Sequence, residues 1–103
     1  MPKKQLIDYT RLKAVAPILR TMSHPERLRI VDLLGDDEKA VGEIAEAAGT
    51  GQALTSQHLS RMKDKGVVAC RSDKNKRLYR VVNRSVFKLL ECITDHCELE
   101  ESS

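Results

Sequence analysis

The first regular feature of the chain is a run of apolar residues between positions 12 and 22. They recur at intervals of three and four, the spacing that places side chains on one face of an α-helix. The residues of this face are Leu12, Val15, Ala16, Leu19 and Met22. Pro17 interrupts the run, and proline cannot donate the helical hydrogen bond. The helix is therefore expected either to restart near Ala14 or to bend at the proline.

A second helix is predicted from Glu26 to Leu34. Ser23 and Glu26 have the spacing of a capping box, and Pro25 falls in the first turn, where proline is tolerated. Gly35 follows the last apolar residue and is a typical C-terminal stop. We therefore expect Ser23 to cap this helix and Gly35 to end it.

Residues 41–66 have the pattern of two short helices joined by a glycine turn. Residues 41–48 are mostly small or apolar and are followed by Gly49-Thr50-Gly51, and residues 52–65 form a second helical stretch that Gly66 closes. One face of this second helix carries Thr55, Leu59 and Met62. The other face is polar and consists of Gln52, Ser56, Gln57, Ser60, Arg61 and Lys63. Small residues that allow close approach, followed by a polar second helix, are typical of a helix-turn-helix.

After Gly66 the periodicity changes from helical to alternating. Residues 67–71 and 77–82 are rich in Val, Leu and Tyr and are predicted to be strands, with residues 72–76 as the turn between them. A last helix is expected from Ser85 to about Glu98, with apolar residues on one face. These residues are Val86, Leu89, Leu90 and Ile93.

This order of elements predicts a mainly α fold with a small β-hairpin. It is that of a winged helix-turn-helix with about five helices and a two-stranded wing. We expect residues 1–11 to form an N-terminal arm, residues 12–98 one DNA-binding and dimerisation domain, and residues 99–103 a frayed acidic tail. A chain of 103 residues has the length of a single domain.

The positive charge of the chain is concentrated in one segment. Residues 61–84 contain nine basic and two acidic residues, a net charge of +7, whereas the whole chain carries +3. A field of one sign over a small domain is the electrostatic pattern of a protein that binds a polyanion, although a charge run alone can also be a solvated face. No apolar run approaches a membrane span or a signal peptide, so we expect a cytoplasmic protein without membrane contact.

Several segments resemble the ArsR/SmtB family of bacterial repressors. The first is Ser23-His24-Pro25-Glu26-Arg27-Leu28-Arg29-Ile30, which looks like the entry to the family's second helix. Residues 41–45 with 56–59 are similar to its helix-turn-helix, and residues 66–68 with 78–81 to its wing strands. The match covers most of the chain, from about Leu12 to Cys97. The resemblance implies a homodimer, paired through its first and last helices, that binds a palindromic operator in double-stranded DNA and releases it when a ligand arrives.

The second helix of the helix-turn-helix is expected to enter the major groove. Glutamine can make paired hydrogen bonds to a base edge there, so Gln52 and Gln57 are predicted to contact bases. Ser56, His58 and Arg61 are predicted to contact phosphates. Cations at the wing give affinity with little sequence information, and the residues expected in this role are Lys74, Lys76 and Arg77. Relatives commonly carry a small and then an apolar residue where this chain has Leu54-Thr55, so Thr55 is expected inside and Leu54 outside, toward a thymine methyl group.

The chain has three cysteines, Cys70, Cys92 and Cys97. A small, odd number of cysteines does not indicate a disulfide framework. Packing, metal ligation and redox sensing remain open for them, and Cys70 on a wing strand is interpreted as packing. The resemblance implies ligand positions for the best known metal sites of the family, and this chain lacks those ligands. It also implies a dithiol site, but one of the two cysteine positions holds Asp32 in this chain. A candidate sensor remains on the last helix.

That candidate sensor consists of Cys92, His96 and Cys97. Cys92 and His96 are four residues apart and hence about 40° apart around the helix axis. Thiolate and imidazole favour a thiophilic ion such as Zn²⁺ or Cd²⁺, but two ligands per chain do not complete a tetrahedral site, so a dimer would have to supply the others. A buried cysteine that only packs, with no cofactor at all, is the alternative.

Three hypotheses of different classes follow from the sequence. The favoured one is a homodimeric repressor that a thiophilic metal ion or a reactive sulfur or oxidant species releases from its operator. The second is a DNA-binding regulator of the same fold with no small-molecule sensor, and the third is a winged-helix protein-interaction module. An enzyme is not expected, because the chain has neither a glycine-shaped nucleophile turn nor a phosphate-binding loop.

Overall fold

The computed structural model describes residues 5–96. Its elements in chain order are α1 (Tyr9–Thr21), α2 (Pro25–Leu34), β1 (Lys39–Ala40), α3 (Val41–Ala48), α4 (Gln52–Asp64), β2 (Val68–Asp73), β3 (Lys76–Val81) and α5 (Ser85–His96). This architecture confirms the predicted winged helix-turn-helix with five helices. None of the helices in this part of the chain is long and apolar enough to cross a bilayer.

The core forms where α2, α3 and α4 pack together over the sheet. Apolar residues of these helices and of the start of the hairpin meet there and exclude water. Those with at most 2% of their surface exposed are Ile30, Val31, Leu34, Ile44, Leu59, Met62, Val67 and Val68. Burial of an aliphatic side chain of this size contributes about 1.5–3 kcal/mol, so this cluster holds the helix-turn-helix against the wing.

The sheet has three strands in the order β1-β3-β2, all antiparallel, instead of the two predicted. The added strand β1 pairs Lys39 with Tyr79 and Ala40 with Leu78. The hairpin is also longer than predicted, because Ser72 pairs with Arg77 and Asp73 with Lys76, which leaves only Lys74-Asn75 as the turn. Since β1 leads directly into α3, the wing is tied to the first helix of the helix-turn-helix.

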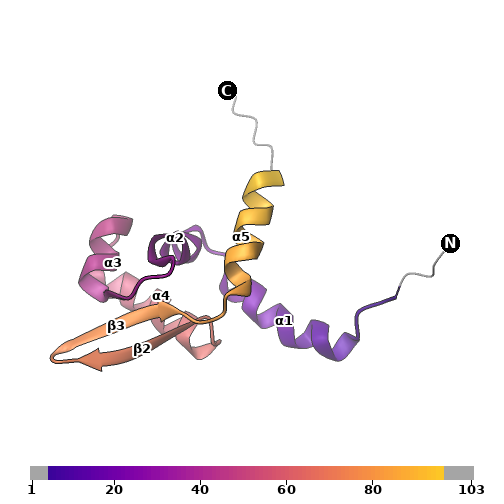
Figure 1. The fold of residues 1–103 in the computed structure, drawn as a ribbon, viewed down its shortest axis with the longest axis horizontal. Coiled ribbons are helices and arrows are strands. Elements are labelled where there is room, and N and C mark those ends of the chain that lie inside the picture. The colour runs from indigo at the N-terminus through magenta and orange to yellow at the C-terminus, as the bar shows by residue number, and fades with distance from the viewer. Residues whose placement is uncertain (1–4, 97–103) are drawn as a thin grey trace, which may run out of the picture.

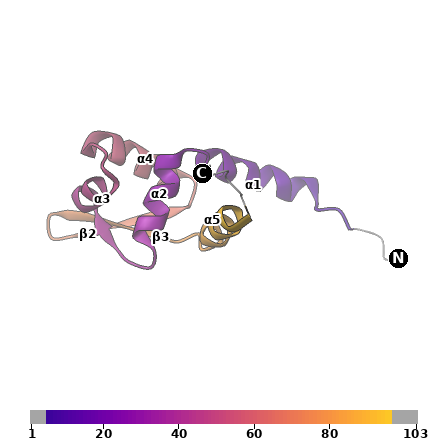
Figure 2. The same ribbon diagram turned by 90° about the horizontal axis from the view of Figure 1, so that it is seen from above.

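Helix α1 differs from its prediction in its first residue. It begins at Tyr9, where the carboxylate of Asp8 accepts a hydrogen bond of 3.4 Å from the Thr10 amide. It also runs through Pro17 as one helix, so of the two alternatives predicted it does not restart near Ala14. In Figures 1 and 2 this helix extends away from the core, at the opposite end of the molecule from the tip of the hairpin.

Helix α2 begins after a turn that was predicted only in part. Its N-cap is His24, and the Ser23 hydroxyl donates instead to the Arg20 carbonyl at 2.7 Å, so Ser23 closes α1 and does not cap α2. Gly35 ends α2 as predicted, with a φ of 52° that disfavours residues with a side chain. The last helix is described as far as His96, and the predicted tail lies outside the described residues.

Candidate nucleic-acid interface

The helix-turn-helix is shaped by the turn between α3 and α4. Gly49 ends α3 in the left-handed conformation, with a φ of 73°, and the Thr50 amide donates to the Ala45 carbonyl at 3.0 Å. A glycine at this place satisfies the last carbonyls of a helix and reverses the chain at little cost. The turn therefore allows α4 to begin three residues later, at Gln52, and to pack across α3.

Helix α4 has one buried face and one exposed polar face. Thr55, Leu59 and Met62 are fully buried, whereas Leu54 is 45% exposed, as the sequence predicted for the Leu54-Thr55 pair. The structure brings most of the polar residues predicted on α4 to its exposed side: Gln52, Ser56, Gln57, Ser60, Arg61 and Lys63. Their amide, hydroxyl and guanidinium groups can form hydrogen bonds with base edges and phosphates.

His58 does not belong to this exposed set. Only 8% of its surface is exposed, and its Nδ1 accepts a hydrogen bond of 3.0 Å from Nε of Arg27 on α2. The sequence prediction placed it among the phosphate contacts, but it faces α2 and the core. Its spacing of three residues from Thr55 and four from Met62 is the signal that could have assigned it to the buried face.

The wing carries exposed cations at its tip. Lys74 lies in the hairpin turn, Lys76 begins β3, and Arg77 follows, with its Nη1 3.9 Å from Sγ of Cys70. The three side chains have no ion pair within residues 5–96. Their charge is therefore available to a polyanion. Figure 1 shows the hairpin extending from the region where β2 packs against α4.

Other basic residues of the positive segment are already paired with the acidic loop before β1. Arg71 donates to both carboxylate oxygens of Glu38, at 2.7 and 2.9 Å, and this hydrogen bonding lowers the pKa of Glu38. Arg84 lies 2.7 Å from the Asp36 carboxylate and stacks on Phe87. The sequence alone does not distinguish these two paired arginines from the basic residues without an ion pair.

Residues 24–69 match the family model described as bacterial regulatory protein, arsR family. The HTH-type transcriptional regulator YgaV of Escherichia coli is 39% identical over 72 residues, which cover 69% of this chain and 73% of the relative. The biofilm growth-associated repressor of Xylella fastidiosa is 33% identical over 94 residues, 90% of this chain and 82% of that one. The chain belongs to the ArsR family of bacterial regulatory proteins.

A solved structure supports the same assignment. It is the homodimeric winged helix-turn-helix DNA-binding domain of a possible ArsR-family transcriptional regulator from Mycobacterium bovis. The two folds agree with a TM-score of 0.75 at 28% identity, over 95% of this chain and 94% of the other. The resemblance noted from the sequence motifs is thus confirmed, and the ArsR family consists of transcriptional regulators and not enzymes.

In this ArsR-family protein, α1 and α5 expose an apolar surface. Leu12, Val15 and Leu19 of α1 are 44–47% exposed, and Ile93 of α5 is 56% exposed. Between α1, α2 and α5 lies an apolar cavity of about 300 Å³ lined by Leu19, Met22, Val31, Leu89 and Ile93 among others. A contiguous apolar face of this kind marks a surface for association.

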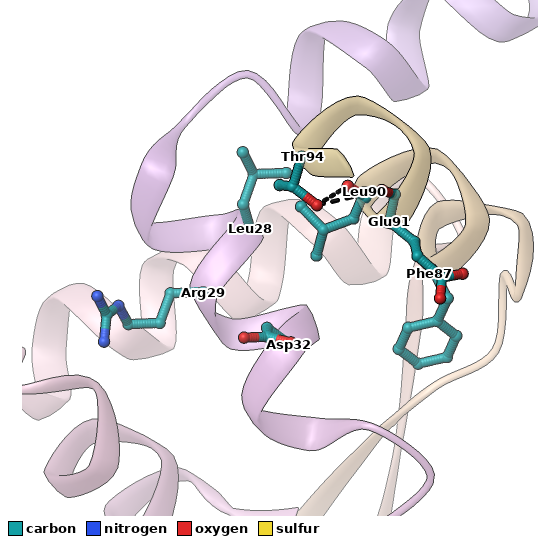
Figure 3. Close-up of a pocket in the computed structure, with 7 residues that line it drawn as sticks. All are labelled: Leu28, Arg29, Asp32, Phe87, Leu90, Glu91 and Thr94. Atoms are coloured by element: carbon teal, nitrogen blue, oxygen red, sulfur yellow. Dashed lines mark hydrogen bonds between the residues drawn. The ribbon is translucent and has the colours of Figure 1, made fainter. Parts of the chain in front are cut away.

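A second cavity, of about 640 Å³, opens between α2 and α5. Figure 3 shows Leu28 and Asp32 of α2 on one side and Phe87, Leu90 and Glu91 of α5 on the other. The hydroxyl of Thr94 is held by the Leu90 and Glu91 carbonyls. Cys92 does not line this cavity, so the cavity and the cysteine are separate features of α5.

The structure describes only part of the predicted sensor. Cys92 lies exposed on α5, and His96 is the last residue of that helix, while Cys97 lies outside the described residues. Within residues 5–96 no group of three potential metal ligands comes together. Cys70 is half-buried against the core, consistent with the packing role predicted for it.

Proposed function

We propose that this ArsR-family protein is a homodimeric repressor that binds a palindromic operator in a sequence-specific manner. The observation that carries the proposal is that α4 exposes a polar face and that the wing exposes cations with no ion pair within the described residues. An α-helix fits the major groove of B-DNA, and wing cations then reach the adjacent backbone. Such a protein acts where bacterial DNA lies, in the cytoplasm.

Each polar group has a separate role in this proposal. Gln52 and Gln57 contact base edges, and Ser56 and Arg61 contact phosphates. Leu54, exposed near the start of α4, faces a thymine methyl group. The wing contacts come from Lys74, Lys76 and Arg77. His58 is left out of the contact set because it is buried.

The experiment that tests sequence-specific binding uses Gln57. An operator is first enriched from a random duplex library with the wild-type protein, and affinities are then measured by fluorescence anisotropy. Gln57→Ala is expected to cost about 1–3 kcal/mol on the enriched operator and almost nothing on random DNA, because a base contact is lost but no phosphate contact.

Two outcomes would contradict this proposal. Equal losses on operator and random DNA would mean that Gln57 does not contact bases. If no DNA sequence is enriched, and if the protein binds a partner protein with an affinity that does not depend on salt, the protein-interaction module is favoured. Lys88→Ala is a matched control, since this exposed residue lies on α5, outside the proposed contact set.

We further propose that a thiophilic ion or a sulfur oxidant, acting at Cys92, His96 and Cys97, releases the operator. The support is the exposure of Cys92 on the helix whose apolar side chains are proposed to pair the protomers. A ligand weakens DNA binding only by as much as it prefers the unbound conformation, and a tenfold loss requires about 1.4 kcal/mol of coupling.

Serine substitutions test this sensor. Zn²⁺, Cd²⁺ or a persulfide donor is expected to lower operator affinity about tenfold in the wild type, and Cys92→Ser or Cys97→Ser is expected to abolish the response. Cys70→Ser serves as the control and should respond like the wild type. If the Cys92/Cys97 double variant still responds, the sensor lies elsewhere. If no agent acts on the wild type, the protein is a regulator without such a sensor.

A further inference from the structure

One arginine connects three helices, α1, α2 and α4. Nε of Arg27, on α2, donates to Nδ1 of His58 on α4 at 3.0 Å, and Nη1 of the same guanidinium donates to the Thr21 carbonyl at 3.0 Å. Thr21 is the last residue of α1. Arg27 therefore ties the end of α1 to the middle of α4, the helix that carries the proposed base contacts.

The bond between Arg27 and His58 requires a neutral imidazole. Because Nδ1 accepts the hydrogen from Arg27, the single ring proton of neutral His58 must lie on Nε2. That Nε2 is buried and has no hydrogen-bond partner within the described residues. A second proton would convert Nδ1 into a donor that faces the Arg27 N–H, and it would place an imidazolium beside a guanidinium.

We propose that Arg27 is a positioning residue for α4, and that it holds α4 for DNA binding only while His58 is neutral. This inference rests on the proposed function, since α4 is taken to be the helix that contacts bases. His58 lies directly after Gln57 in α4, so a rotation of the helix at His58 displaces Gln57 as well. Paired hydrogen bonds to a base weaken steeply when their angles and distances change.

The groups around His58 favour the neutral ring. Burial lowers its pKa most, and the positive charge of Arg27 lowers it further. His24, whose ring centroid lies 6.1 Å away, acts in the same direction, whereas Glu26 raises the pKa. The pKa of Arg27 is itself lowered, mainly by burial and then by the positive charge of Arg61 on α4, whereas Glu26 raises it.

The sign of the resulting pH dependence follows from these directions. The folded protein holds His58 with a pKa below the usual histidine value of about 6.5, so the unfolded chain takes up its proton first on acidification. The stabilisation from neutral His58 is therefore complete above that value and is lost as the pH falls through the folded pKa. DNA binding is expected to weaken over the same range.

This direction is opposite to the one that charge alone predicts. Protonation adds positive charge to the protein, and added positive charge strengthens binding to the DNA phosphates. A general titration of surface histidines would therefore raise the affinity on acidification. A loss of affinity can be assigned to a local change such as the one at His58.

The test is the ratio of operator affinities at about pH 7.5 and about pH 5.5, at constant ionic strength, measured by fluorescence anisotropy. The wild type is expected to bind about fivefold or more weakly at the lower pH. His58→Asn places an amide oxygen near the position of Nδ1, where it accepts from Arg27 but does not titrate, and its ratio is expected to be close to 1. His24→Gln removes the neighbouring histidine but leaves Arg27 and His58 in place, so its affinity should still fall on acidification.

Arg27→Met provides an independent variant. It removes both hydrogen bonds and is expected to lower operator affinity at both pH values while leaving little difference between them. Random DNA, bound mainly through phosphates, should be affected much less. This readout keeps the inference testable if His58→Asn does not fold.

The outcomes separate this inference from the proposed function. Suppose that operator affinity depends on Gln57 but that the wild-type affinity is constant or rises on acidification. This result would overturn the inference and leave the proposed function intact. A pH-dependent loss that persists in His58→Asn or Arg27→Met would also overturn it. If no operator is enriched at all, the proposed function fails first.

Discussion

Placing charge on the apolar faces of α1 and α5 is expected to yield a folded monomer that binds the operator about 100-fold more weakly or worse. The change is Leu19→Glu with Ile93→Glu. These side chains are 47% and 56% exposed in the single chain, so glutamate at both positions should cost the monomer little. In a dimer paired through α1 and α5 the same carboxylates would be buried without partners, which is strongly unfavourable.

The loss of DNA affinity follows from the loss of the second half-site contact. In a dimer, binding of one half-site makes binding of the other intramolecular, which raises the affinity by about 10²–10⁴ without any new contact. Sedimentation velocity at micromolar concentration gives the mass of the particle, and fluorescence anisotropy gives its affinity for the full operator and for a single half-site. The variant and the wild type should differ on the full operator and agree on the half-site.

Val82→Glu is the control for this experiment. Val82 is also apolar and 41% exposed, but it follows β3 and lies on neither α1 nor α5. This variant should remain a dimer and keep its affinity. A double variant that stays dimeric, or a wild type that sediments as a folded monomer, would exclude α1 and α5 as the dimer interface.

The main elements of the fold could be predicted because each has a local signal. Apolar residues at helical spacing predict α1, α2 and α5. Glycines predict where helices end: Gly35 follows α2, Gly49 follows α3, and Gly66 lies between α4 and the wing. The third strand could not be predicted in this way. Lys39–Ala40 is too short for any alternation, and it becomes a strand only because β3 lies beside it in the folded chain.

The sequence predicts which basic and polar residues belong to the candidate site, but not which of them form ion pairs or hydrogen bonds within the fold. The sequence shows nine basic residues between Arg61 and Arg84 but does not tell which of them meet a carboxylate. The partners of Arg71 and Arg84 lie 33 and 48 positions earlier in the chain, in the loop before β1, so only tertiary structure brings them together. For the same reason His58 was predicted to contact phosphate, although inside the fold its Nδ1 accepts a hydrogen bond from Arg27.

The unpaired cations of the wing lead to the second large effect. Lys76→Ala with Arg77→Ala is expected to weaken binding to operator and random DNA alike. It should also make the dependence of log affinity on log salt shallower by about 1–2 units per half-site, since each neutralised phosphate contributes about 0.9. Both residues are exposed near the hairpin turn and have no ion pair within the described residues. Anisotropy titrations over a series of salt concentrations measure both quantities.

Arg71→Ala with Arg84→Ala is the matched control for the wing variant, because it removes the same number of positive charges from the same segment. These guanidiniums lie 2.7 Å from the carboxylates of Glu38 and Asp36, so part of their charge is already balanced by an acidic partner. The control is therefore expected to keep the wild-type salt slope, with a thermal melt to confirm that the wing is still folded. An equal change of slope in the two double variants would mean that net charge, and not the unpaired wing contacts, governs DNA affinity. An unchanged slope in Lys76→Ala with Arg77→Ala would place the phosphate contacts elsewhere on the protein.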